Sequence, residues 1–212
     1  MSHENTLREE ICQTGFSLHQ RGFTVGSSGN ISARLDDGWL ITPTDVCLGA
    51  LQPAMIAKVN SDGEWVKGGK PSKTLTLHRT IYQNNAEVHG IVHTHSTHLV
   101  GMTLGKVWSK AAILPPITPY QVMKVGRIPL IDYCRPGSPL VAEQAAQLAA
   151  TVKGIMLERL GPVIWGATVT KAAEILEELE ETAKLWLMTD PKPEALDQAA
   201  MQDLFDTFDC RW

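Results

Sequence analysis

The sequence predicts an α/β fold in which a central, mainly antiparallel sheet is covered by helices. The first reason is that short, strand-like segments arrive in pairs joined by turn sequences, at 31–35 with 39–42 and at 56–59 with 64–66. The second is that helix-like periodicity falls between groups of strands rather than between single strands. Such a pattern fits a mainly antiparallel sheet better than a doubly wound parallel sheet.

The remaining elements follow from local signals. Helices are expected at about 5–21, 73–84 and 139–154, and from Thr168 or Thr170 to about Met188. Segments 155–157 and 163–165 read as buried strands, and 128–133 as an edge strand because Pro129 cannot donate a ladder hydrogen bond. The tail after Pro191 is expected to be peripheral.

Length and composition bound the function. The 212 residues fit one domain spanning 1–212, and the net charge of −4 argues against a nucleic-acid or anionic-membrane partner. The four cysteines are scattered, which indicates reduced thiols rather than disulfides or a zinc knuckle. The N-terminus is polar, and no stretch approaches the roughly 18 apolar residues of a membrane span. We therefore expect a cytoplasmic protein.

The histidines of the segment Val88-His-Gly-Ile-Val-His-Thr-His-Ser-Thr-His98 are the strongest chemical signal. Alternate side chains of a strand share a face, so His93 and His95 should lie side by side. Two imidazoles held this way can chelate a divalent metal. The alternative is that they are polar residues at the end of a strand.

Three loops rich in glycine, hydroxyls and backbone donors precede this strand, at 26–30, 42–45 and 71–73. Together with a metal they suggest a phosphate cradle beside a Lewis acid. Lys73 would add a charge suited to phosphate or to a substrate carboxylate, unless it is simply solvated. Tyr120 and Tyr133 lie in proline-flanked segments and could donate protons, although core or interface roles are the usual explanation.

The order of these motifs resembles the class II aldolase/adducin family, which includes fuculose-phosphate aldolases and ribulose-phosphate epimerases. The matching motifs cover nearly the whole chain. They are Gly29-Asn30-Ile31-Ser32, Ile41-Thr42-Pro43-Thr44, Pro71-Ser72 before a helix carrying His78, Val92-His93-Thr94-His95-Ser96 and Gly161-Pro162-Val163. Within the family, Pro71-Ser72-Lys73, Thr118-Pro119-Tyr120 and Tyr133 with Arg135-Pro136-Gly137 most resemble the 3-oxo-tetronate 4-phosphate decarboxylases.

The resemblance implies an α/β/α three-layer sandwich, a fourfold homotetramer with active sites at subunit interfaces, and a divalent metal of the zinc type, with manganese or cobalt as alternatives. It implies that His93 and His95 are metal ligands and that Tyr133 is a catalytic residue supplied by a neighbouring subunit. The positions it implies for phosphate binding are Gly29, Asn30, Thr44, Asp45 and Ser72.

Two positions depart from the family pattern. Leu160 stands where a third histidine ligand is usual, and Thr74 where an acid/base glutamate is usual. A β-keto acid forms its enediolate by losing carbon dioxide and needs no such base, so the loss at Thr74 favours decarboxylation over aldol cleavage. Glu158 would share the face of Leu160 in a regular strand, and we expect it to replace the missing ligand. The alternative is that Glu158 pairs with Arg159 of another subunit or with Lys73.

The expected function is therefore that of a metal-dependent carbon–carbon lyase. The expected reaction converts a 3-oxo-tetronate 4-phosphate, a small phosphorylated sugar acid, to dihydroxyacetone phosphate and carbon dioxide. One alternative is a sugar-phosphate aldolase or epimerase of the same family. Another is a non-catalytic member whose metal site is degraded.

Overall fold

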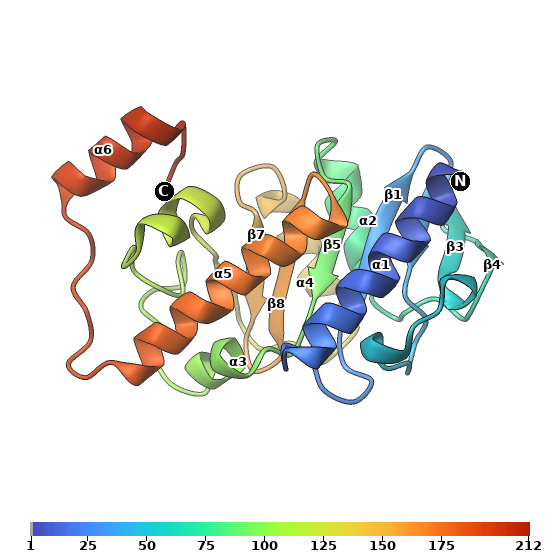
Figure 1. Cartoon of the computed structure of the whole chain (residues 1–212), viewed down its shortest axis with the longest axis horizontal. Helices are drawn as coiled ribbons and strands as arrows, with labels where there is room; N and C mark the ends of the chain where they lie inside the picture. The colour runs from blue at the N-terminus through green and yellow to red at the C-terminus, as the bar shows by residue number, and fades with distance from the viewer. Residues whose placement is uncertain (1) are drawn as a thin grey trace.

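The computed structural model describes residues 2–212, so Met1 of the expected domain lies outside it. One eight-stranded sheet crosses the molecule in the order β4-β3-β2-β1-β5-β8-β7-β6 (Figure 1). Neighbouring strands are antiparallel except for β6 and β7, which are parallel. The strands are β1 Asn30–Leu35, β2 Gly38–Ile41, β3 Ala57–Asn60, β4 Trp65–Lys67, β5 Gly90–His93, β6 Leu130–Ile131, β7 Gly154–Leu157 and β8 Gly161–Gly166. The predicted fold class is confirmed.

Within residues 2–212, six α-helices accompany the sheet, together with short 3₁₀ turns at Leu48–Ala50 and Pro53–Met55 and a π-helical turn at Gln121–Val125. The helices are α1 His3–Gln20, α2 Leu75–Asn84, α3 Thr97–Thr103, α4 Pro139–Leu148, α5 Val169–Met188 and α6 Gln198–Phe208. Helices α3 and α6 and the π turn were not predicted from the sequence. Helix α4 was predicted to end at 154, six residues beyond its observed end at Leu148. Of the two candidate starts for α5, Thr168 is the cap, because its side chain accepts a hydrogen bond from Lys171 N.

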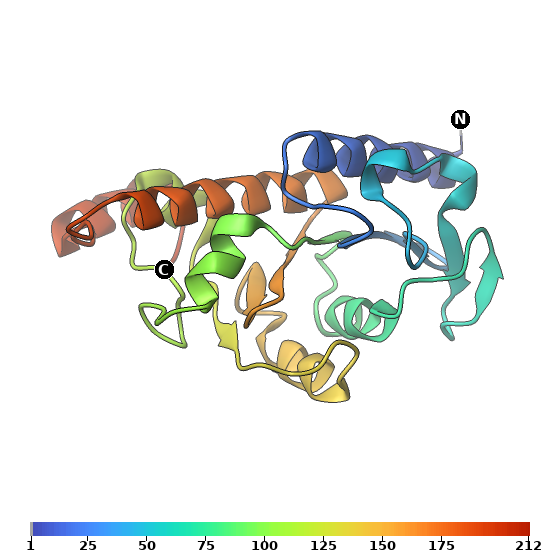
Figure 2. The ribbon, with the colours of Figure 1, turned by 90° about the horizontal axis from the view of Figure 1, so that it is seen from below.

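Two layers of helices enclose the sheet, as Figure 2 shows. Helices α1, α3 and α5 pack on one face, and α2 and α4 pack together on the other. The alternation of β5 divides its side chains between the two resulting cores, with Val92 on the α1/α5 side and Ile91 on the α2/α4 side. By the same alternation His93 belongs to the α2/α4 face, and this face carries the candidate site.

The two edges of the sheet are formed by the short strands β6 and β4. β6 forms one edge, beside β7, as Pro129 predicts. The short β4 forms the other edge, and all three of its residues are exposed. β5 lies inside the sheet, hydrogen-bonded on both sides, which fixes the position of its last residue, His93.

The structure also bears on the expectations about membrane spans and disulfides. Within residues 2–212, none of the helices is long and apolar enough to cross a membrane. All four cysteines are free thiols.

Candidate functional site

The two histidines lie together at the end of β5. The strand ends at His93, and His95 follows in the turn that leads to α3, rather than two residues further along a regular strand as expected. Their rings nevertheless lie edge to face, with centroids 5.1 Å apart and an interplanar angle of 62°. The predicted adjacency of the two imidazoles is therefore present, although a turn produces it.

His93 is held in the form that a metal ligand needs. Its Nδ1 lies 2.8 Å from Pro162 O, and because a carbonyl only accepts, Nδ1 carries the proton and Nε2 is left with its lone pair. Burial lowers the pKa of His93 to about 4, helped by the neighbouring His95 and opposed by the bond to Pro162. Burial also lowers the pKa of His95. Both rings are therefore neutral near pH 7 and able to donate to a cation.

These histidines open into a cavity of about 460 Å³ that contains most of the expected site. Eleven positions singled out in the sequence line it: Gly29, Asn30, Thr44, Asp45, Ser72, Lys73, Thr74, Glu158, Leu160, His93 and His95. The register of the sheet is one reason, because Asn30 of β1 pairs directly with His93 of β5. The donor-rich loops and the histidines therefore meet at the same edge of the sheet.

The loops on the β1 side have the form of an anion cradle. Gly29 has a φ of 85°, and a Cβ there would lie 2.7 Å from His93 O, so only glycine lets this loop approach the strand so closely. Ser72 does not cap α2 directly; its Oγ instead lies 3.3 Å from Thr74 N, its donor, and 3.0 Å from Thr74 Oγ1. Thr74 precedes the helix without a side-chain cap bond. The amide of Leu75 bonds to Ser72 O at 3.1 Å, so within the described chain the amides of Thr76 and Leu77 are the ones left for a ligand.

Two buried polar atoms in the lining lack a protein partner within the described part of the chain, namely Asn30 Oδ1 and His78 Nε2. Such atoms are costly to bury unless something else satisfies them. Their presence in the wall of this cavity fits a site built to hold a polar ligand.

His78 is a site residue whose role was not predicted from the sequence. Its Nδ1 lies 2.7 Å from Ser32 Oγ, which in turn lies 2.8 Å from Tyr82 OH. Burial, and then His93, lowers the pKa of His78 to about 3. The available signal was its place beside Leu77, Ile81 and Tyr82 on the buried face of α2, together with its appearance in the family motif.

The other wall comes from the segment between β6 and α4 and from the β7–β8 turn. Asp132, Cys134, Arg135, Pro136, Gly137 and Ser138 line it, together with Glu158 and Leu160. The sequence identified Arg135-Pro136-Gly137 only as a shared motif. Its closeness to the histidines depends on how β6 pairs with β7, which local patterns do not reveal.

The two tyrosines lie apart from the rest of the predicted site. Tyr120 and Tyr133 are 59% and 62% exposed, and neither is among the residues from 2 to 212 that line the cavity. The backbone N–H of Tyr133 donates to Glu158 Oε2 at 2.8 Å, so only its main chain is tied to the site of its own subunit. The catalytic roles of both tyrosines stay predictions, as does the supply of Tyr133 by a neighbouring subunit.

Among the described residues, the cavity supplies two groups suited to metal binding, His93 and His95, but not a clear third one. Two neutral imidazoles are suitable ligands, but no group of three His, Cys, Asp or Glu side chains within residues 2–212 is arranged to hold an ion. Glu158 lines the cavity, where its carboxylate accepts from Tyr133 N and lies 3.7 Å from Arg159 Nε of the same chain. Its role as third ligand stays a prediction, and further donors would come from substrate, water or another subunit.

Helix α3 follows the histidines directly, and Glu180 of α5 holds its start. The Glu180 carboxylate accepts from His98 N at 2.9 Å, from Leu99 N at 3.0 Å and from His98 Nδ1 at 2.8 Å. A side chain of one helix thus caps the N-terminus of another. This contact fixes the chain immediately after His95.

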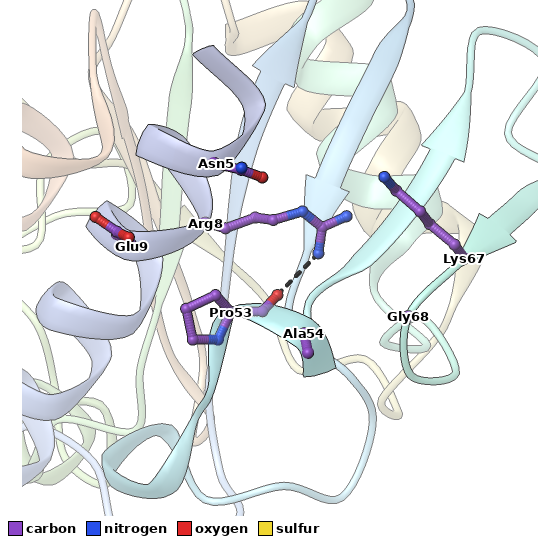
Figure 3. A pocket seen from close by; sticks show the side chains of 7 residues that line it. All are labelled: Asn5, Arg8, Glu9, Pro53, Ala54, Lys67 and Gly68. Carbon is purple, nitrogen blue, oxygen red and sulfur yellow. Dashed lines mark hydrogen bonds between the residues drawn. The ribbon is translucent and has the colours of Figure 1, made fainter. Parts of the chain in front are cut away.

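A second cavity, of about 410 Å³, lies beneath the start of α1 (Figure 3). Arg8 bonds there to Pro53 O at 2.9 Å (Figure 3). The Glu4 carboxylate pairs with Arg8, Lys58 and Lys67 at 2.8, 3.2 and 2.9 Å. The two cations of its lining, Arg8 and Lys67, are thus already paired with Glu4, whereas Glu9 forms no ion pair with residues 2–212. None of its described lining residues is a histidine, so the cavity beside His93 is the better candidate site.

The sequence matches the model of the class II aldolase and adducin N-terminal domain over residues 9–187. The chain belongs to this family. Members of the family generally depend on a divalent metal. The predicted resemblance is thereby confirmed.

Within the family, the chain is most clearly similar to proteins named as 3-oxo-tetronate 4-phosphate decarboxylases. The chain is 63% identical to a 3-oxo-tetronate 4-phosphate decarboxylase of Cupriavidus necator, over 100% of both chains, and 42% identical to one of Escherichia coli K12, over 90% of each. Its structure matches that of Escherichia coli YgbL, described as a putative aldolase/epimerase/decarboxylase, with a TM-score of 0.91 and 40% identity over 96% of this chain and 99% of that one. An L-fuculose 1-phosphate aldolase shares the fold, with a TM-score of 0.83 and 21% identity over 99% and 98%.

Proposed function

We propose that the protein decarboxylates a 3-oxo-tetronate 4-phosphate to dihydroxyacetone phosphate and carbon dioxide, as a metal-dependent carbon–carbon lyase. The observation that carries the proposal is the cavity in which a pair of neutral histidines faces donor-rich loops. Full-length identity of 63% to a decarboxylase of that name supports the substrate.

The reaction breaks the bond between C1 and C2 of the substrate. The electron pair of that bond forms the C2–C3 double bond, the C3 carbonyl oxygen gains negative charge, and C1 leaves as carbon dioxide. Protonation of C2 then gives dihydroxyacetone phosphate. The chain must therefore stabilise charge at the C3 oxygen, hold the phosphate and deliver one proton.

His93 and His95 would hold the metal, with Glu158 as the proposed third ligand. A zinc-type ion, with manganese or cobalt as alternatives, would supply positive charge beside the oxygens of the substrate. The bond from His93 Nδ1 to Pro162 O keeps the ring oriented for this role. No carboxylate is needed at Thr74, because loss of carbon dioxide itself generates the enediolate.

The loops carrying Gly29, Asn30 and Ser72 would bind the phosphate through amide and hydroxyl donors, with Thr44, Asp45 and Lys73 beside them. Tyr133 of a neighbouring subunit, or Tyr120, would protonate C2. The proposal includes a fourfold homotetramer, because both tyrosines are exposed and lie outside the cavity of their own chain. It also includes a single domain over the whole chain and a cytoplasmic location, which four free thiols support.

The test is release of carbon dioxide from a 3-oxo-tetronate 4-phosphate, coupled to detection of dihydroxyacetone phosphate. Retro-aldol cleavage of sugar 1-phosphates is measured on the same preparation. Activity on the keto acid supports the proposal, whereas activity on the sugar phosphates alone would establish an aldolase instead.

An aldolase is the second candidate because the chain is 35% identical, over 84% of its length, to an L-fuculose phosphate aldolase of Methanocaldococcus jannaschii. Metal content separates both enzymes from a non-catalytic member of the family. Protein that holds no stoichiometric metal, as purified or after addition of zinc or manganese, would contradict both enzymatic proposals.

The proposed third ligand has its own test. Replacing Glu158 by Gln should weaken metal affinity by about tenfold or more, as expected for loss of a ligand or its close support. Unchanged affinity would remove Glu158 from the metal site.

A further inference from the structure

We propose that Arg135 binds the substrate carboxylate and so determines selectivity for sugar acids over neutral sugar phosphates. The inference rests on the proposed function for the chemical class of the ligand, an acyclic sugar phosphate with a carboxylate at the end opposite its phosphate. It assigns a role to a residue that the fold brings into the cavity and that the mechanism above does not use.

The cations lining the cavity lack ion-pair partners in the described part of the chain, whereas most of its acidic residues have partners. Its two permanent cations, Lys73 and Arg135, form no side-chain hydrogen bond or ion pair with residues 2–212. Of its three acidic residues, Asp132 pairs with Lys110 at 2.6 Å and Glu158 is held by Tyr133 N and Arg159. Asp45 alone among them is unpaired within the described chain. Two unpartnered cations facing one cavity suit a ligand with two anionic groups better than one with a phosphate alone.

The order of the strands separates the two cations. His93 ends β5, which lies between β1 and β8 in the sequence of strands β1-β5-β8-β7-β6. Lys73 stands with the Gly29 and Ser72 loops, on the side of β1 and α2. Arg135 follows β6, on the opposite side of β5. The histidine pair therefore lies between the proposed phosphate cradle and Arg135.

The substrate has the same linear order. Its phosphate is on C4, its carbonyl and hydroxyl oxygens are on C3 and C2, and its carboxylate is C1. With the phosphate in the cradle and the central oxygens at the histidines, the carboxylate points toward the wall that carries Arg135. A guanidinium suits this end because it can form two parallel hydrogen bonds to a carboxylate, which an ammonium cannot.

The contact would act on binding rather than on the chemical step. The carboxylate is charged in the bound substrate and leaves as neutral carbon dioxide, so an ion pair with it stabilises the ground state. Replacing Arg135 should therefore raise KM for the keto acid and leave kcat unchanged or higher.

The test compares two ligands that do not react. One is a tetronate 4-phosphate with a hydroxyl at C3, which keeps the carboxylate but cannot decarboxylate. The other is dihydroxyacetone phosphate, which lacks the carboxylate. Calorimetric affinities are measured for the wild-type protein, Arg135→Met, Lys73→Met and Arg127→Met. Arg127 is exposed and is not among the described residues that line the cavity, so it serves as the matched control.

Arg135→Met should bind the tetronate 4-phosphate about tenfold or more weakly, the size expected for losing a charge-assisted pair, with less than about a twofold change for dihydroxyacetone phosphate. Lys73→Met should weaken both ligands, and Arg127→Met neither. Equal losses for both ligands in Arg135→Met would assign Arg135 to the phosphate and overturn the inference, as would unchanged affinity for the acid or a fall in kcat at constant KM.

The outcome is separable from that of the proposed function. If wild-type protein released no carbon dioxide from the keto acid but Arg135→Met selectively lost the tetronate 4-phosphate, the decarboxylase proposal would fail and the carboxylate site would stand. If the wild-type protein released carbon dioxide but Arg135→Met lost affinity equally for both ligands, the decarboxylase proposal would stand and the carboxylate site would fail. Unaltered thermal unfolding of Arg135→Met verifies that the variant is folded.

Discussion

Glu180 should be a strong determinant of stability because it satisfies the start of α3 from a neighbouring helix. Its side chain is 10% exposed and accepts three hydrogen bonds, two of them from the backbone amides of His98 and Leu99. The informative change is Glu180→Gln, which keeps the shape of the side chain but turns one acceptor into a donor.

The cost follows from those contacts. Glutamine can accept from only one of the two amides with its single oxygen, and its NH₂ group then faces the other N–H. Leaving one buried N–H unpaired costs roughly 1–3 kcal/mol, and bonds to a neutral acceptor are weaker than bonds to a carboxylate. We expect a loss of about 2–3 kcal/mol in the free energy of unfolding, which for a chain of this size corresponds to a fall in Tm of roughly 5–10 °C.

Thermal unfolding of matched variants measures the effect. Glu181→Gln is the control, because Glu181 is 60% exposed and lies 3.6 Å from Lys184, a surface pair worth at most about 1 kcal/mol. If the Tm values of Glu180→Gln and Glu181→Gln agreed within about 1 °C, the capping argument would be refuted, since a buried unsatisfied amide cannot be that cheap.

Three further predictions test other parts of the molecule. Gly161→Ala should destabilise the fold by about 2–4 kcal/mol in urea unfolding, because φ is 141° and a Cβ would overlap Thr94 O; full stability would contradict this crowding. Burial raises the pKa of Glu4, but hydrogen bonds from three cationic neighbours outweigh it and lower it from 4.5 to about 2. Its contribution to stability is therefore complete above about pH 4.5 and is lost as pH falls toward 2; Glu4→Gln should flatten this acid limb, and an unchanged limb would exclude Glu4 as its source. His93→Ala should reduce metal retained after dialysis by about tenfold or more, and undiminished retention would place the metal elsewhere.

The sequence predicted much of the fold because its strongest patterns were local. Paired strand-like segments around glycine-containing turns predicted the hairpins, and Thr168 with its acidic, amphipathic continuation predicted α5. The failures have identifiable causes. Helix α3 has only seven residues, too few for a clear period, and its N-terminal amides depend on Glu180, which lies far away in the sequence. Helix α4 ends at Leu148, and a turn in which Thr151 N bonds to Leu148 O precedes Gly154, the first residue of β7.

Site residues were predictable where a short motif carries several ligands. The His93 and His95 pair and the loop at Gly29 fall in such motifs, and all three line one cavity. Arg135 and His78 were harder to assign. His78 reads as one more polar residue in an amphipathic helix, and only the packing of α2 against β1 brings it to Ser32. The position of Arg135 depends on the parallel pairing of β6 with β7, a long-range contact without a local sequence signature.

The central position of β5 has a consequence for the order in which the protein matures. His93 is paired with Asn30 on one side and Val163 on the other, and its Nδ1 needs the carbonyl of Pro162. One of these partners leaves the ribosome long before the histidine and the other long after it, so two long loops must close before the imidazole is oriented. A nascent chain that ends before β8 therefore cannot present an ordered ligand pair. Metal capture should coincide with completion of folding, so that the bound ion stabilises finished molecules and discriminates against truncated ones.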